Sequence, residues 1–239
     1  MNKLPFYIGN IVSCFVPNNK RRSRVRGWIN VMLYRHRIMS FVKTSYGVKP
    51  KHVRFVRQIT LNRMTCVVDN VYYVKIFRNV TVQQLENFKF LLDFIRPYIN
   101  VEIPDIIVDK RMPMYVCKKI PGRPISDFDA EFVLKHEKSF LSQVADIIAQ
   151  LQSVDVKSVP GWERFVFSMQ PERTVEKPCD SEHMVFAHFD LNRTNFLFDD
   201  DFNIIGLIDW DTLSVAKNPE TDWDIFMKYW NNYKRKHRK

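Results

Sequence analysis

The most constraining feature of the chain is a polar octapeptide, residues 188–195 (HFDLNRTN), set between two short apolar runs. The runs 185–187 and 196–198 are predicted strands because they are short, apolar and rich in Phe. A further apolar run, 204–208, is the next predicted strand and leads directly into Asp209. We therefore expect a strand–loop–strand unit whose polar side chains meet at one edge.

Three side chains of this unit match the requirements of phosphoryl transfer. Asp190 and Asn195 form an H-x-D-x-x-x-x-N pattern, and Asp209 is delivered opposite them by the next strand. A carboxylate must meet the acceptor hydroxyl and orient or take its proton, while an amide and a second carboxylate hold Mg²⁺ against the phosphates. This predicts Asp190 as the catalytic base and Asn195 and Asp209 as magnesium ligands. We interpret His188 as a support for the loop and Asp211 as a solvated carboxylate, an auxiliary acidic residue of the site being the alternative for Asp211.

The combined motif resembles the aminoglycoside phosphotransferase and choline kinase family, the small-molecule branch of the protein-kinase-like fold. Residues 188–195 are similar to that family's catalytic loop, and residues 208–211 (IDWD) to its metal-binding segment. Residues 219–222 (PETD) resemble the P-x-x-D element that follows. The resemblance covers about residues 53–230 and implies transfer of the γ-phosphate of ATP to a hydroxyl, with Mg²⁺ as the metal.

The first half of the chain fits this resemblance independently. Five runs rich in Val, Ile, Phe, Tyr or Thr are predicted strands, and Asp69-Asn70 supplies a tight turn. A helix is inserted among them; it begins after Thr81, has Gln84 three residues on as a capping box, and ends at Pro97. The predicted strands are 52–61, 65–68, 71–77, 101–108 and 114–120.

Lys75 and Glu86 are the candidate nucleotide-binding residues of this half. Lys75 sits in an otherwise apolar strand, where an ammonium needs a partner because burying it alone is expensive. Glu86 lies eleven residues later on the inserted helix. The resemblance implies that Lys75 binds the α- and β-phosphates and that Glu86 holds Lys75; a solvated ion pair is the alternative.

These elements predict an α+β, two-lobed, protein-kinase-like fold. It has a five-stranded antiparallel N-lobe sheet with one inserted helix, and a short, mostly helical C-lobe with helices at 132–151 and 221–233. The expected domains are a basic N-terminal segment at 1–51, a nucleotide-binding lobe at 52–120, and a catalytic lobe with a basic tail at 121–239.

Charge is distributed unevenly along the chain. Residues 1–68 contain fourteen Lys or Arg and no Asp or Glu, and six more basic residues follow Asp224. Basic ends favour an anionic partner, either an acidic membrane or a phosphorylated glycan; solubility alone is the alternative. Nucleic acid is disfavoured because no nucleic-acid-binding motif is present.

A helix predicted over residues 21–43 lies within the basic opening segment. Its apolar residues Val25, Met32 and Met39 recur every seven positions, with Trp28 beside them. This stripe predicts packing on the body of the protein, with a membrane-surface helix as the alternative.

The acceptor is assigned from weaker features. Residues 15–22 loosely resemble the openings of bacterial surface-polysaccharide biosynthesis proteins. Together with the basic ends, this favours a sugar of lipopolysaccharide or capsule, small metabolites and antibiotics being the alternatives. Four cysteines without paired spacing favour a cytoplasmic location. The basic ends add the expectation of peripheral contact with the inner face of the membrane. The rival functions are a catalytically silent kinase-like binding module, a protein-substrate kinase and a basic nucleic-acid-binding module.

Overall fold

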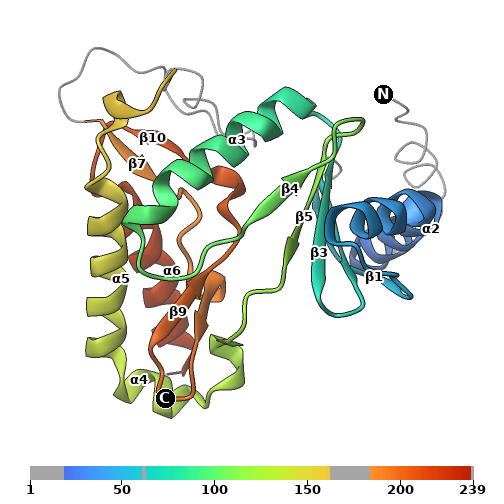
Figure 1. The fold of residues 1–239 in the computed structure, drawn as a ribbon. Helices are drawn as coiled ribbons and strands as arrows, with labels where there is room; N and C mark the ends of the chain where they lie inside the picture. Colours follow the sequence, from blue (N-terminus) through green and yellow to red (C-terminus); the bar gives the residue numbers. More distant parts are fainter. Residues whose placement is uncertain (1–18, 61–62, 162–183, 238–239) are drawn as a thin grey trace. The chain divides into compact units, whose positions relative to one another are not determined.

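A computed structural model describes most of the chain (Figure 1). The described residues are 19–60, 63–161 and 184–237. Within them, no helix is both long enough and apolar enough to cross a membrane.

The chain divides into two compact units, each built from separate stretches of sequence. The first unit consists of Met1–Lys89 and Asp105–Lys119, and the second of Phe90–Pro104 and Ile120–Lys239. The chain therefore passes between the units three times.

The first unit contains the expected five-stranded antiparallel sheet, in the order β1-β2-β3-β5-β4. Asp69 and Asn70 have positive φ values of 52° and 59°, and the N–H of Val71 donates to the carbonyl of Val68 at 3.0 Å. The predicted tight turn between β2 and β3 is therefore confirmed. The strands are β1 (Val53–Thr60), β2 (Arg63–Val68), β3 (Tyr72–Phe77), β4 (Ile106–Val108) and β5 (Met114–Lys118).

Helix α2 (Asn19–Tyr46) packs on one face of this sheet. Its inward side chains recur every three or four residues and share a core with alternate residues of β2 and β3. Gly27 permits a close approach to β1, because a Cβ at this position would lie 2.2 Å from the ring of Phe55. The buried stripe consists of Val31, Tyr34, Ile38 and Val42.

The heptad stripe expected to pack on the body lies on a different face of α2. Trp28 and Met32 are 60% and 57% exposed, while Val25 and Met39 are half-buried. The packing prediction for this stripe is therefore wrong. Two apolar stripes run along the helix, and periodicity alone does not say which of them meets the sheet.

Helix α3 (Val82–Ile95) begins with the predicted capping box. The N–H of Gln84 donates to Thr81 Oγ1 at 3.1 Å, and the N–H of Thr81 donates to Gln84 Oε1 at 2.8 Å. The predicted apolar stripe of this helix is buried as expected. Its members are Leu85, Phe88, Leu92 and Ile95.

The strand predicted over residues 101–108 is wrong as a continuous element. Pro104 interrupts the run because it has no N–H to donate to a ladder. The two parts pair separately: Glu102 forms a parallel bridge with Gly206, and Ile106–Val108 joins the five-stranded sheet as β4. The bridge ties the segment after α3 into the second unit.

The second unit combines small antiparallel sheets with longer helices. One sheet has the order β6-β8-β9, and the other pairs β7 with β10. The strands β6 and β10 were not predicted, because two or three residues are too few to form a pattern. The strands are β6 (Arg123–Pro124), β7 (Val185–Ala187), β8 (Phe196–Phe198), β9 (Ile204–Leu207) and β10 (Ser214–Ala216). The helices are α4 (Ala130–Lys135), α5 (Glu137–Gln152) and α6 (Thr221–His237).

The single helix predicted over residues 132–151 is wrong, because α4 and α5 are separated at His136. His136 has φ −95° and ψ 12°, outside the helical range, and its Nδ1 lies 2.8 Å from the carbonyl oxygen of Phe132. The backbone N–H of His136 donates to the same carbonyl at 3.2 Å, so His136 closes the last turn of α4 before α5 begins.

An aromatic core anchors the strand that follows the polar octapeptide. The ring of Phe140 on α5 contacts Phe196 on β8 and Phe226 and Trp230 on α6, with centroid distances of 5.7, 5.5 and 5.2 Å. All three contacts are edge-to-face, the arrangement that aromatic quadrupoles favour. β8 is therefore a rigid base for residues 188–195.

Candidate active site

The buried carboxylate of Asp222, at the start of α6, holds the beginning of the 188–195 loop. Its Oδ2 accepts the N–H of His188 at 2.7 Å, and its Oδ1 accepts the N–H of Phe189 at 2.8 Å. Burial raises the pKa of this carboxyl to about 6, and the two hydrogen bonds oppose that rise. Asp222 thus fixes the backbone immediately before Asp190.

His188 supports the loop from its own buried position. The N–H of Asp190 donates to His188 Nδ1 at 3.3 Å, which requires the proton of the neutral ring to be on Nε2. Nε2 lies 3.3 Å from the carbonyl oxygen of Ile208 and donates to it in this tautomer. The imidazole therefore joins the loop to the segment that leads to Asp209.

The carbonyl oxygen of Asp190 is tethered by two side-chain amides. Asn195 Nδ2 donates to it at 2.8 Å and Asn192 Nδ2 at 3.1 Å. Asn192 also accepts the N–H of Thr194 at 3.0 Å, which caps the short helical turn that ends at Asn195. The backbone of Asp190 is thus restrained from both sides.

Backbone pairing brings Asn195 next to the segment that carries Asp209. The N–H of Ile208 donates to the carbonyl of Asn195 at 2.9 Å, continuing the β8–β9 ladder by one residue. Paired residues of antiparallel strands lie about 5 Å apart. Ile208 lies opposite Asn195, and Asp209 is the next residue after Ile208. The structure therefore brings the loop and the Asp-Trp segment together, as the sequence predicted.

Strained backbone occurs at two positions of this site. Phe189 has φ 59°, and Asp209 has φ 64° and ψ 48°, the left-handed region that residues other than glycine seldom occupy. Phe189 directly precedes Asp190, and Asp209 is a predicted magnesium ligand. Such strain persists only where surrounding contacts enforce it, and it concentrates at functional sites.

A magnesium ion would find suitable donors here. The amide of Asn195 donates to the loop through Nδ2, so its acceptor atom is Oδ1, and Asp209 contributes a carboxylate from the segment next to Asn195. Amide and carboxylate oxygens suit Mg²⁺, which takes its other ligands from water and substrate phosphates. Among the described residues, no group of three or more His, Cys, Asp or Glu is placed to bind a metal.

Lys75 and Glu86 both lie in the first unit. Lys75 on β3 pairs in register with Thr65 and Tyr115, and its Nζ lies 5.8 Å from the centroid of the Tyr115 ring. Glu86 is half-buried near the start of α3. The roles assigned to these two residues stay predictions.

Two acidic residues of the second unit differ from the sequence interpretation. Asp211 is only 1% exposed, so its interpretation as a solvated carboxylate is wrong. Asp222 was recognised only as part of the PETD element, without a role at the loop. The buried apolar neighbours of Asp222 on α6 were the available signal, since a carboxylate on a buried helix face needs hydrogen-bond partners.

Solved structures similar to this fold extend over most of the chain. The GDP complex of wild-type aminoglycoside 2'-phosphotransferase-IIIa is 13% identical, with 84% of this chain and 80% of that chain covered and a TM-score of 0.61. The apoenzyme of macrolide 2'-phosphotransferase MphH from Brachybacterium faecium is 17% identical, with 84% and 82% covered and a TM-score of 0.54. Aminoglycoside phosphotransferase APH(3'')-Id from Streptomyces rimosus is 14% identical, with 83% and 84% covered and a TM-score of 0.58. No family model and no curated protein matches the chain.

The chain therefore has the fold of the aminoglycoside and macrolide phosphotransferases. This confirms the α+β fold class and, at the level of the fold, the family resemblance that the HFDLNRTN and IDWD motifs indicated.

Proposed function

We propose that the protein is an ATP- and Mg²⁺-dependent phosphotransferase that acts on a hydroxyl of a small molecule. The observation that carries this proposal is the restrained 188–195 loop, whose backbone is held by Asp222, His188, Asn192 and Asn195 on both sides of Asp190. A catalytic base must be held in position, and the restrained backbone fixes the point from which the Asp190 side chain extends. The similar folds support it, since several of them are named as nucleotide complexes of phosphotransferases, such as streptomycin–ATP–APH(2")-IIa.

Each predicted residue has a distinct task in this reaction. Asp190 orients the acceptor hydroxyl and takes its proton as the phosphoryl group is transferred. Asn195 and Asp209 would hold magnesium, which neutralises charge on the phosphates. Lys75 binds the α- and β-phosphates, and Glu86 keeps its ammonium in position.

The exposed face of α2 supports a location at an anionic membrane. Trp28, Met32 and Leu33 are 60%, 57% and 47% exposed. At 3.6 residues per turn, Arg35 and Arg37 lie on opposite borders of this apolar face, and both are exposed. An exposed apolar face bordered by arginines is typical of helices that lie in the membrane interface. A sugar of lipopolysaccharide or capsule, assembled at the inner face of a bacterial membrane, is the acceptor that such a location favours.

The reaction is tested by measuring ATP consumption with a panel of hydroxyl-bearing acceptors and identifying the phosphorylated product. The Asp190→Asn variant should lose about 10²–10⁴-fold in turnover and retain nucleotide affinity. Nucleotide binding without turnover on any acceptor would favour a silent binding module. Phosphorylation of a protein alone would favour a protein-substrate kinase.

Membrane attachment is tested separately by sedimentation with acidic and neutral vesicles. The Trp28→Ser/Met32→Ser variant should lose binding to acidic vesicles, and higher salt should weaken binding of the wild type. Val71→Ser, which changes an exposed apolar residue away from α2, is the matched control. Equal binding of all three proteins, or binding to neutral vesicles alone, would contradict the proposal.

A further inference from the structure

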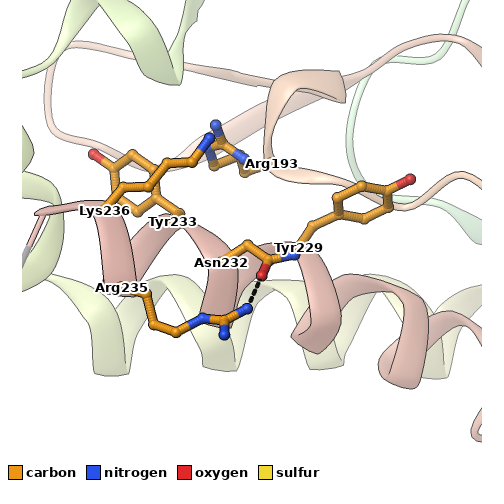
Figure 2. Close-up of a pocket in the computed structure, with 6 residues that line it drawn as sticks. All are labelled: Arg193, Tyr229, Asn232, Tyr233, Arg235 and Lys236. Atoms are coloured by element: carbon orange, nitrogen blue, oxygen red, sulfur yellow. Dashed lines mark hydrogen bonds between the residues drawn. The ribbon is translucent and has the colours of Figure 1, made fainter.

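A pocket of about 550 Å³ lies between the 188–195 loop and the last turns of α6 (Figure 2). Arg193 comes from the loop, and the remaining lining residues come from the helix. The lining residues are Arg193, Tyr229, Asn232, Tyr233, Arg235 and Lys236.

The charged side chains that line this pocket are all positive. Three of its lining residues are Arg or Lys, and within the described chain no carboxylate is among them. Tyr233 adds no negative charge near neutral pH, because burial raises the pKa of its phenol above the ordinary value of 10. Asp129, the N-cap residue of α4, also acts on Tyr233, and its carboxylate accepts the N–H groups of Glu131 and Phe132. The pocket is therefore suited to an anion.

The cationic groups are held in position by their neighbours. The guanidinium carbon of Arg193 lies 4.7 Å from the centroid of the Tyr233 ring, a cation–π contact. Figure 2 shows Lys236 extending past the same ring toward Arg193. Arg235 donates a hydrogen bond to Asn232, drawn as the dashed line in Figure 2. A bound anion would form charge-assisted hydrogen bonds with the cationic groups that line the pocket.

The pocket is close to the proposed catalytic base along the chain. Arg193 is three residues after Asp190, and three residues span at most about 11 Å. A ligand bound through Arg193 is therefore held by the same restrained loop that carries the proposed catalytic base. Aminoglycosides carry protonated amines at neutral pH, and such a ligand would be repelled here.

We propose that this pocket binds a phosphate or carboxylate group of the acceptor, so that the protein phosphorylates an anionic sugar. This inference rests on the proposed phosphotransferase function and assigns the substrate class of the same site. An anionic acceptor would distinguish this protein from the aminoglycoside phosphotransferases, whose fold the chain shares.

Binding is measured first, by calorimetry of the full chain without nucleotide. Glucose 6-phosphate is the probe, and glucose and glucosamine are the neutral and cationic comparisons. Arg193→Gln and Lys236→Gln should each weaken binding of the phosphorylated sugar by about ten- to hundredfold, since each removes a charged hydrogen-bond donor. Lys228→Gln, an exposed charge on α6 outside the pocket, should leave it unchanged. Equal affinity for the three sugars, or no effect of Arg193→Gln, would overturn the proposal.

Turnover then separates this inference from the proposed function. If the protein phosphorylates acceptors but Arg193→Gln leaves the preference for anionic over neutral sugars unchanged, the pocket assignment fails and the function stands. If the anion binds through Arg193 and no acceptor is phosphorylated, the proposed function fails. An anion that binds here and changes turnover without becoming phosphorylated would overturn its assignment as part of the acceptor.

Discussion

The carboxylate of Asp222 accepts the backbone N–H of His188 across a sequence separation of 34 residues. Replacing it with Ala leaves the N–H groups of His188 and Phe189 without their acceptors beside the proposed catalytic base. We expect Asp222→Ala to lower the free energy of unfolding by about 2–4 kcal/mol below pH 4, where Asp222 is neutral, since each buried donor left without an acceptor costs about 1–3 kcal/mol. Urea unfolding measures this loss, and an unchanged midpoint would contradict it.

The raised pKa of Asp222 predicts that the stability of the protein depends on pH. Because burial raises the pKa of Asp222 to about 6 from 3.8, its contribution to stability is full below pH 3.8 and is lost as the pH rises through 6. The difference in unfolding free energy between the wild type and Asp222→Asn should therefore decrease between pH 4 and pH 7, by at most about 3 kcal/mol. A difference that grows with pH would show that the pKa is lowered instead.

Phe189 offers a test of backbone strain at the loop. Its φ of 59° is accessible to glycine and unfavourable for alanine. Phe189→Gly should therefore be more stable than Phe189→Ala by about 1 kcal/mol, the reverse of the order in a helix. Chemical denaturation of the two variants is the measurement, and both lose the same aromatic ring. The opposite order would mean that the loop does not require the left-handed conformation.

Asp209 should couple nucleotide affinity to magnesium. The Asp209→Ala variant is expected to lose most of the Mg²⁺-dependent part of ATP binding, because its carboxylate is a proposed ligand of the metal. Calorimetry with and without Mg²⁺ measures this part directly. Asp201→Ala, an exposed carboxylate on the β8–β9 turn, is the control. Metal-dependent affinity that survives in Asp209→Ala would exclude this residue from the metal site.

Asn30 is a buried polar residue of α2 whose side-chain amide has no hydrogen-bond partner among the described residues. A buried amide without a partner is unfavourable by about 1–3 kcal/mol. Asn30→Leu, which keeps the number of side-chain heavy atoms and the branch at Cγ, should therefore raise the free energy of unfolding by about 1–2 kcal/mol. Destabilisation by Asn30→Leu would indicate a partner in the segments outside the described residues.

The features that the sequence predicted correctly have local causes. The Thr81–Gln84 capping box and the Asp69-Asn70 turn each depend on residues a few positions apart. The errors have non-local causes. The sheet decides which apolar stripe of α2 is buried, and the partners of Asp222 lie more than thirty residues away. Short-range patterns carry no information about such contacts.

The path of the chain between its two units limits how the protein can be divided. The hydrogen bond from Leu207 N–H to the carbonyl of Glu102, at 2.9 Å, attaches the segment Phe90–Pro104 to β9. A fragment that begins at Ile120 would lack this segment and leave that edge of β9 unpaired. Separate expression of the two halves should therefore yield an aggregation-prone C-terminal piece, and fragment complementation would need a cut at a place other than residue 120.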